Sequence, residues 1–175
     1  MSEYQYFEWQ TCDRFLTDTE QEAVRRLSSH IEGSANRAVV SYSWGDFRHA
    51  PLQVLERFFD AHLYLANWGS RRLAFRFPAG QVNRRAIASH CVPDRISFTT
   101  AGKYDILDLD LGDESGGEWL EPDGVLSTLL PLRQEILQGD YRALYLAWLK
   151  ALSLDEEAEC ERNLSAASDH APALP

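Results

Sequence analysis

The feature that most constrains the fold is the alternation of apolar and polar residues in two short segments. Residues 71–77 (RRLAFRF) place Leu73, Phe75 and Phe77 on one side of an extended chain and arginines on the other. Residues 104–111 (YDILDLDL) repeat the pattern with leucine and aspartate. Because the side chains of a strand point alternately to its two faces, this period predicts strands with one buried face. Such a face has to pack against another layer.

Three more strands are predicted. Residues 4–12 (YQYFEWQTC) and 37–43 (RAVVSYS) are rich in aromatic and β-branched residues, which favour strands. Residues 95–111 form a predicted hairpin that turns around Ala101-Gly102, and the leucine–aspartate segment is its second strand. With residues 71–77, the chain has about five strands.

Helix signals lie between the strands. Thr17 and Glu20 have the spacing of a capping box, which predicts a helix from there to about His30. Residues 51–69 show the strongest helical periodicity, with Pro51 in the first turn and a broad apolar face. Further helices are predicted over residues 80–91, over 125–138 with a break before Pro131, and over 141–152.

This order of elements predicts an α+β domain over residues 1–152. We expect a mixed or mostly antiparallel sheet of about five strands, covered by helices, with a C-terminal helical hairpin. Residues 153–175 are acidic and rich in small residues, so burial would not offset the entropy lost on ordering them. They are predicted to form a poorly ordered tail.

The composition is that of a globular protein, with 45% hydrophobic and 11% aromatic residues among 175. The cysteines Cys12, Cys91 and Cys160 are far apart and form no CxxC pair, which argues against a disulfide framework and a zinc knuckle. No signal peptide is visible, and no apolar run reaches the roughly 18 residues that span a bilayer. We therefore expect a cytoplasmic protein without a cofactor, structural metal or membrane partner.

The net charge of −10 is concentrated in the second part of the chain. Residues 1–103 carry a net charge of +2 and residues 104–175 a net charge of −12. Binding to a phosphate backbone is driven by lysine and arginine, so an acidic protein is poorly suited to it. Nucleic acid is therefore disfavoured as a partner, except at a local patch of arginines.

Carboxylates and imidazoles near residue 50 raise the question of a metal site. Asp46, His49, Asp60 and His62 are of the types that ligate zinc and harder cations. On a helix over residues 51–69, however, Asp60 and His62 diverge by about 200° and cannot share one ion. We expect His62 to be a packed, hydrogen-bonded histidine, and Asp46 and His49 to cap the following helix.

Two other patterns invite a chemical interpretation. His90 and Cys91 are a base beside a thiol, but neighbours in sequence rarely face each other and no orienting group is evident. A buried Cys91 beside a surface His90 is expected instead. The acidic residues between 105 and 123 lack the EF-hand spacing, so a solvated strand face and an acidic loop are favoured over a cation site. Walker, GxGxxG, GxSxG and HExxH motifs are absent from the sequence.

Positive charge gathers in one stretch, at Arg71, Arg72, Arg76, Arg84 and Arg85. An arginine can clamp a carboxylate or a phosphate with two parallel hydrogen bonds. These residues could pair with the acidic loop of the same chain, or hold an anionic ligand or partner.

Two aromatic loops carry the leading functional hypothesis. Trp44, Asp46 and Phe47 belong to the WGDF segment, and Trp68 precedes Arg71 in a second turn that contains glycine. Tryptophan and arginine are enriched in binding hot spots, and loops carry many binding sites. We therefore expect a noncatalytic protein-interaction module that binds another protein; burial of both tryptophans in the core is the alternative.

Two other functions stay open. An enzyme could hold a small anionic substrate with the strand arginines and use Asp46 or His49 as acid or base. Nucleic acid could bind to the region Arg71–Arg85, although the acidic half argues against it. Convergence of these groups in a concave pocket would favour the enzyme, whereas a flat surface bearing tryptophans would favour the module.

Segments along nearly the whole chain resemble a family of uncharacterised bacterial proteins. The matching segments are YQYFEW at residues 4–9, DRFLT at 13–17, YSWGDF at 42–47, FFDAHLYLANWGSRRL at 58–73, and LLPLR with GDYRALYLAWL near the end. WGDF and ANWG are the most distinctive. The resemblance implies a bacterial cytoplasmic protein and assigns no catalytic residue, cofactor or partner. Such proteins often continue beyond an acidic, proline-containing segment, so the resemblance leaves open whether this chain is a shortened form of a longer protein.

Overall fold

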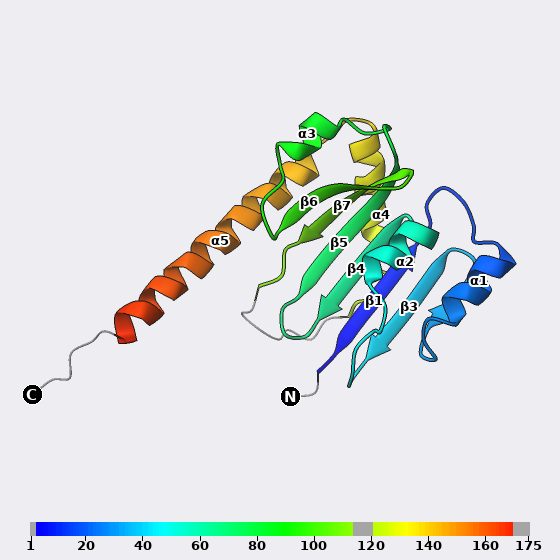
Figure 1. Ribbon diagram of the computed structural model, residues 1–175, viewed down its shortest axis with the longest axis horizontal. Helices are drawn as coiled ribbons and strands as arrows, with labels where there is room; N and C mark the ends of the chain where they lie inside the picture. The colour runs from blue at the N-terminus through cyan, green and yellow to red at the C-terminus, as the bar shows by residue number, and fades with distance from the viewer. Residues whose placement is uncertain (1–2, 114–120, 170–175) are drawn as a thin grey trace, which may run out of the picture.

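The computed structural model describes the backbone of residues 3–113 and 121–169, and side chains as far as Glu156 (Figure 1). Among these residues the chain forms a seven-stranded sheet in which neighbouring strands are antiparallel. In spatial order the strands are β2 (Glu32–Gly33), β3 (Arg37–Tyr42), β1 (Gln5–Gln10), β4 (Ala61–Ala66), β5 (Arg71–Pro78), β7 (Tyr104–Asp110) and β6 (Ile96–Ala101).

Helices cover both faces of this sheet. They are α1 (Asp18–Arg25), α2 (Pro51–Phe58), α3 (Arg84–Ala88), α4 (Val125–Leu137) and α5 (Arg142–Asp169). Helices α1 and α2 pack on one face, and α4 lies behind the sheet with α3 and the first part of α5 (Figure 1). The result is three layers with two hydrophobic cores.

Strand β1 supplies side chains to both cores. Phe7 and Trp9 belong to the core under α1 and α2, and the indole Nε1 of Trp9 donates to the carbonyl of Pro51 at 3.1 Å. Tyr6 belongs to the core under α4 and α5. This division follows from the period of two along the strand, since alternate residues point to opposite faces.

The α+β class is confirmed, and the strand number is corrected from about five to seven. Strand β2 has only two residues, and β4 lies within residues 51–69, which were predicted to be helical. Helix α2 ends at Phe58 because Phe59 is already extended. From Ala61 the chain pairs with β1 and β5, so apolar residues on both faces are buried. A central strand buried on both faces resembles a helix in its apolar content.

Other boundaries also differ from the predicted ones. The capping box of Thr17 and Glu20 is confirmed, but α1 ends at Arg25. Helix α4 runs through Pro131 without a break, despite the hydrogen bond that proline removes. Leu126 and Ile136, on either side of that proline, are buried and anchor both halves of the helix. Helix α5 continues to Asp169, beyond the predicted domain end at residue 152. The C-terminal hairpin stays a prediction.

Candidate functional site

The two tryptophan loops lie at the same end of the sheet. Gln5 at the start of β1 pairs with Tyr42 at the end of β3 and with Ala66 at the end of β4. The loop that follows β3 carries Trp44, and the turn that follows β4 carries Trp68. We define the tryptophan end as Trp44, Gly45, Asp46 and Trp68 with the intervening side chains Gln5 and Tyr64.

A hydrogen-bond relay holds the first loop in place. The side-chain amide of Gln5 donates to the Asp46 carboxylate at 2.7 Å and to the carbonyl of Gly45 at 3.0 Å. The Tyr64 hydroxyl donates to the amide oxygen of Gln5 at 3.0 Å. Burial and the charge of Asp46 raise the pKa of Tyr64, so this phenol stays a neutral donor.

Backbone contacts hold the second turn. Asn67 donates its backbone N–H to the carbonyl of Tyr4 at 3.0 Å, and Gly69 donates to the carbonyl of Ala66 at 3.1 Å. Gly69 has a φ of +101°, and a Cβ at this position would lie 1.7 Å from the carbonyl oxygen of Asp113. Only glycine therefore fits the turn that presents Trp68.

Both tryptophans face the solvent. Trp44 is 73% exposed and Trp68 is 40% exposed, so the alternative that they fill the core is wrong. Phe47, which was grouped with them, lies instead in the core: its ring centroid is 5.5 Å from that of Phe7 and 5.3 Å from that of Trp9. Trp44 and Phe47 therefore have opposite environments although they are close neighbours in the sequence.

The strand arginines are engaged with carboxylates of the same chain. Arg72 makes a bidentate ion pair with Asp108, and a nitrogen of Arg71 lies 3.9 Å from a carboxylate oxygen of Asp113. Arg76 is only 3% exposed, so the prediction that it is a binding residue on the surface is wrong. Its guanidinium stacks over the Tyr104 ring at 4.1 Å.

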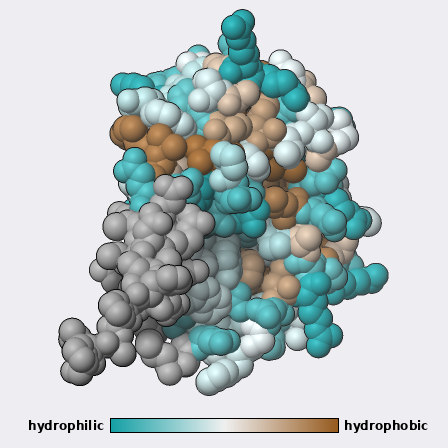
Figure 2. Space-filling model, turned by 60° about the vertical axis from the view of Figure 1, so that its left-hand side comes forward, coloured by the Kyte–Doolittle hydropathy of each residue, from teal (hydrophilic) through white to brown (hydrophobic). Residues whose placement is uncertain are grey.

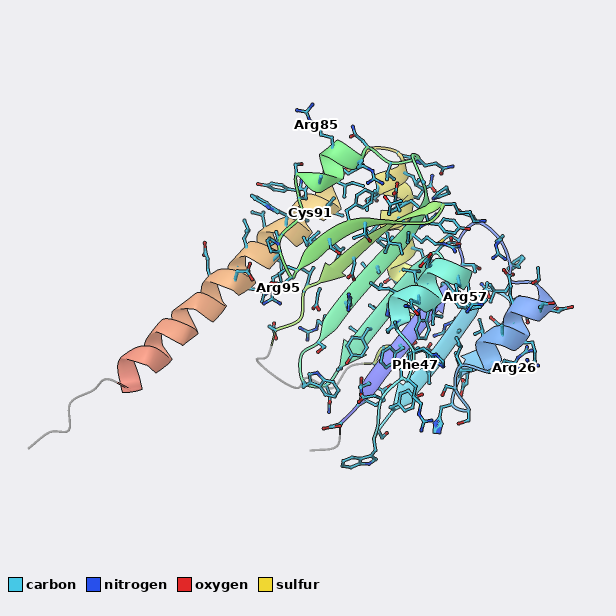
Figure 3. The ribbon with its side chains drawn as sticks, viewed as in Figure 1. Arg26, Phe47, Arg57, Arg85, Cys91 and Arg95 are labelled. Atoms are coloured by element: carbon cyan, nitrogen blue, oxygen red, sulfur yellow. The ribbon has the colours of Figure 1, made fainter. Side chains whose placement is uncertain are left out.

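Helix α3 carries two arginines, of which Arg84 is ion-paired and Arg85 is exposed. Arg84 bonds to Asp105 and also lies over the ring of Phe98. Arg85 extends from α3 away from the sheet (Figure 3). The prediction of a solvated acidic strand face is wrong, because Asp105 and Asp108 are buried and paired with arginines. Glu114 and Glu118, from the same acidic run, lie outside the described residues.

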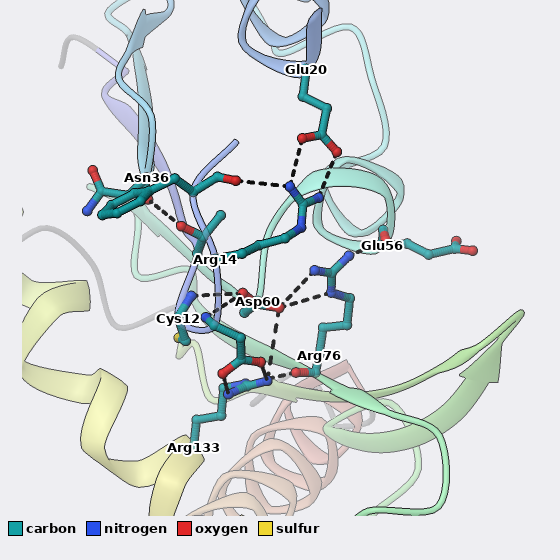
Figure 4. Close-up of polar contacts among 11 residues, drawn as sticks. Cys12, Arg14, Glu20, Asn36, Glu56, Asp60, Arg76 and Arg133 are labelled. Atoms are coloured by element: carbon teal, nitrogen blue, oxygen red, sulfur yellow. Dashed lines mark hydrogen bonds and ion pairs between the residues drawn. The ribbon is translucent and has the colours of Figure 1, made fainter. Parts of the chain in front are cut away.

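A buried ion network lies at the opposite end of β1 (Figure 4). Asp60 accepts from the backbone N–H of Cys12 at 2.8 Å and from Arg76 at 2.8 Å. Arg133 of α4 lies 4.0 Å from Asp60 and forms a bidentate pair with Asp13. Burial raises the pKa of Asp60, but these hydrogen bonds and the two guanidinium charges outweigh it, and the net pKa is lowered. The sequence gives no signal for this network, because its members come from distant segments.

His62 is a core histidine, but not on a helix. It is fully buried in β4, with its ring stacked on Trp9 at 4.8 Å and its Nδ1 2.9 Å from the carbonyl of Glu8. Burial lowers its pKa to about 3. Because residues 59–66 are not helical, the helical angle between Asp60 and His62 does not apply. Within the described part of the chain, no group of three or more His, Cys, Asp or Glu side chains could hold a metal ion.

The remaining candidates do not form reactive pairs. The N-cap of α2 is Ala50 with no side-chain hydrogen bond, so the capping role predicted for Asp46 and His49 is wrong. His90 Nδ1 lies 2.9 Å from the carbonyl of Ala86, whereas the Cys91 thiol points to the carbonyl of Ile87. Burial raises the pKa of Cys91, which disfavours a thiolate.

A scan against protein-family models, a search of curated proteins and a search of solved structures each found no match for this chain. In the described residues, no helix has both the length and the apolar content needed to cross a membrane. We therefore infer a function from the chemistry of the tryptophan end.

Proposed function

We propose that this chain is a noncatalytic protein-interaction module that binds its partner through the tryptophan end. The observation that carries the proposal is the placement of Trp44 and Trp68, both exposed, on two loops that flank Gln5. Tryptophan is enriched in the energetic centres of protein interfaces because it buries a large, rigid surface. We keep membership of the uncharacterised bacterial family and a cytoplasmic location as parts of this proposal.

The contacts that hold the two loops in place support binding. Gln5 holds Gly45 and Asp46, while Gly69 locks the second turn against Asp113. Loops that are ordered before binding lose less conformational entropy when they meet a partner. Asp46, in the same loop as Trp44, is exposed and can supply a polar contact to a partner.

The same contacts give less support to the two other functions. An enzyme would use Asp46 or His49 together with the arginines, but Arg72 and Arg76 bind Asp108 and Asp60. To bind Arg72 or Arg76, an anionic substrate or a phosphate backbone would have to displace the carboxylate that each of them holds. That displacement would leave a buried carboxylate without its cation, which is energetically costly.

The test is affinity capture with tryptophan variants. Tagged protein with Trp44→Ala or Trp68→Ala should lose a partner that the unaltered protein retains from lysate of its native host. Phe15→Ala is the matched control, because Phe15 is 72% exposed and follows β1 at the opposite end of the sheet. Equal capture by all four proteins would count against the tryptophan end. Circular dichroism of each variant establishes that it remains folded.

A further inference from the structure

Helix α5 buries one side and leaves a large apolar side uncovered. Among its side chains up to Glu156, Leu144, Ala151 and Leu154 are buried. Its exposed large apolar residues are Tyr145, Leu146, Leu149 and Leu152. These are four of the seven large hydrophobic residues that are exposed in the described chain, so the exposed apolar surface is concentrated on one helix. A contiguous patch of this kind marks an interaction surface, whereas single exposed residues do not.

The exposed side of α5 has the spacing of a helix–helix seam. Arg142, Tyr145, Leu149, Leu152 and Glu156 follow one another at intervals of three, four, three and four residues. This is the heptad spacing by which two helices pack along each other. On the face that Figure 2 turns towards the viewer, apolar residues gather beside the atoms drawn in grey.

The charges at the two ends of this seam are opposite and symmetrically placed. Arg142 and Glu156 each lie seven residues from Leu149, which is about 10 Å along a helix. Arg142 pairs with Asp140 of its own chain, yet its side chain is 86% exposed and can reach a second carboxylate. Glu156 is exposed.

The charges on this seam are complementary when two copies of α5 run antiparallel. In an antiparallel pair of α5 helices that cross at Leu149, each Arg142 meets the Glu156 of the other copy. The apolar residues between them are then removed from water. A parallel pair would place Arg142 against Arg142 and Glu156 against Glu156, and like charges disfavour that pairing.

The surroundings of α5 leave room for a second helix. At the N-terminal end of α5, a hollow of about 740 Å³ is lined by residues that include His90, Tyr141, Tyr145 and Leu146. The C-terminal half of α5 extends away from the sheet (Figure 1). A helix that runs antiparallel along α5 would cross the hollow and cover Leu146.

We propose that the chain forms a two-fold dimer through the exposed seam of α5, with the helices antiparallel and Leu149 at the axis. The occupant of the patch is thus a second copy of this chain. The tryptophan end lies elsewhere on the molecule and takes no part in this contact.

Analytical ultracentrifugation over a series of concentrations tests the dimer. The unaltered protein should show a monomer–dimer equilibrium. Leu149→Glu places two carboxylates at the axis and should weaken the dimer about 100-fold or more. Phe15→Glu makes the same kind of change at an exposed site away from α5 and should leave the equilibrium unchanged. Circular dichroism checks that both variants keep their helical content.

A charge exchange tests the antiparallel direction. Arg142→Glu and Glu156→Arg should each weaken self-association about two- to fivefold, as expected for exposed ion pairs. A mixture of the two variants should regain dimers, because the carboxylate introduced at position 142 of one chain then faces the guanidinium introduced at position 156 of the other.

Three results would overturn the proposal. They are a chain that sediments as a monomer at every concentration, a Leu149→Glu variant that dimerises as tightly as the unaltered protein, and a mixture of the charge variants that associates no better than either alone. If α5 instead binds a different protein, the chain alone would sediment as a monomer, and that result also overturns the proposal.

Discussion

Arg76 and Asp60 form an ion pair in the interior of the protein, with Nη2 2.8 Å from Oδ1 and side chains that are 3% and 5% exposed. Arg76 also donates to the carbonyl of Glu56 at 2.6 Å. Because both side chains are almost completely buried, each charge needs a nearby opposite charge, and Arg76 is the cation closest to Asp60. The pair ties β5 to the turn between α2 and β4.

Removal of this arginine should destabilise the fold strongly. Arg76→Met leaves the buried Asp60 carboxylate without its closest cation, and we expect the free energy of unfolding to fall by about 3–5 kcal/mol. Urea denaturation followed by circular dichroism measures the change. Arg26→Met is the control. Because Arg26 forms an exposed pair with Glu22, the stability of this variant should stay close to that of the unaltered protein. Equal stability of both variants would contradict the role given to the buried pair.

His62 should make stability depend on pH. Burial lowers its pKa in the folded state to about 3, from 6.5 in the unfolded state. Between these values the unfolded chain binds the proton and the folded chain does not, so stability is full above 6.5 and falls as the pH drops towards 3. From pH 6.5 to 5 the loss should be about 2 kcal/mol, at about 1.4 kcal/mol per pH unit.

His62→Gln isolates that effect, because glutamine does not titrate. Urea denaturation at pH 7 and at pH 5 should show a much smaller difference for the variant than for the unaltered protein. The same difference in both proteins would mean that another group causes the pH dependence.

Arg37 should be needed to neutralise a buried carboxylate. Glu8 is fully buried, and it accepts from Arg37 Nε at 2.6 Å and from the Tyr6 hydroxyl at 2.8 Å. Arg37→Met should lower the free energy of unfolding by about 2–3 kcal/mol, below the range for fully buried pairs because this arginine reaches solvent. The double variant with Glu8→Gln should recover part of the loss in the same denaturation assay. A double variant no more stable than Arg37→Met would argue against an electrostatic cause.

Phe47 and Trp44 should respond in opposite ways to truncation. Phe47→Ala removes a ring that packs on Phe7 and Trp9, and the expected cost is about 3–5 kcal/mol. Trp44→Ala changes an exposed side chain and should alter stability by less than about 0.5 kcal/mol. Thermal unfolding of the two variants gives the comparison. A large destabilisation by Trp44→Ala would place that indole in the core and remove it from the interaction surface.

Local patterns in the sequence were enough to predict several elements. The alternation in residues 71–77 and 104–111 corresponds to β5 and β7, and the spacing of Thr17 and Glu20 corresponds to the cap of α1. These features depend on residues that are close in the chain. The helix predicted over residues 51–69 failed at Phe59, where pairing with β1 and β5 outweighed helical periodicity.

The sequence by itself determined the fold class, most strand positions and the presence of two aromatic loops, because backbone propensity and side-chain alternation act between near neighbours. Only the tertiary structure decided which aromatic residues stay in solvent and which carboxylate neutralises each arginine. Trp44 and Phe47 lie three residues apart in the same loop, whereas Asp60 lies in the turn before β4 and Arg76 lies within β5. Burial and ion pairing depend on which segments meet in the folded sheet, and that information is spread over the whole chain.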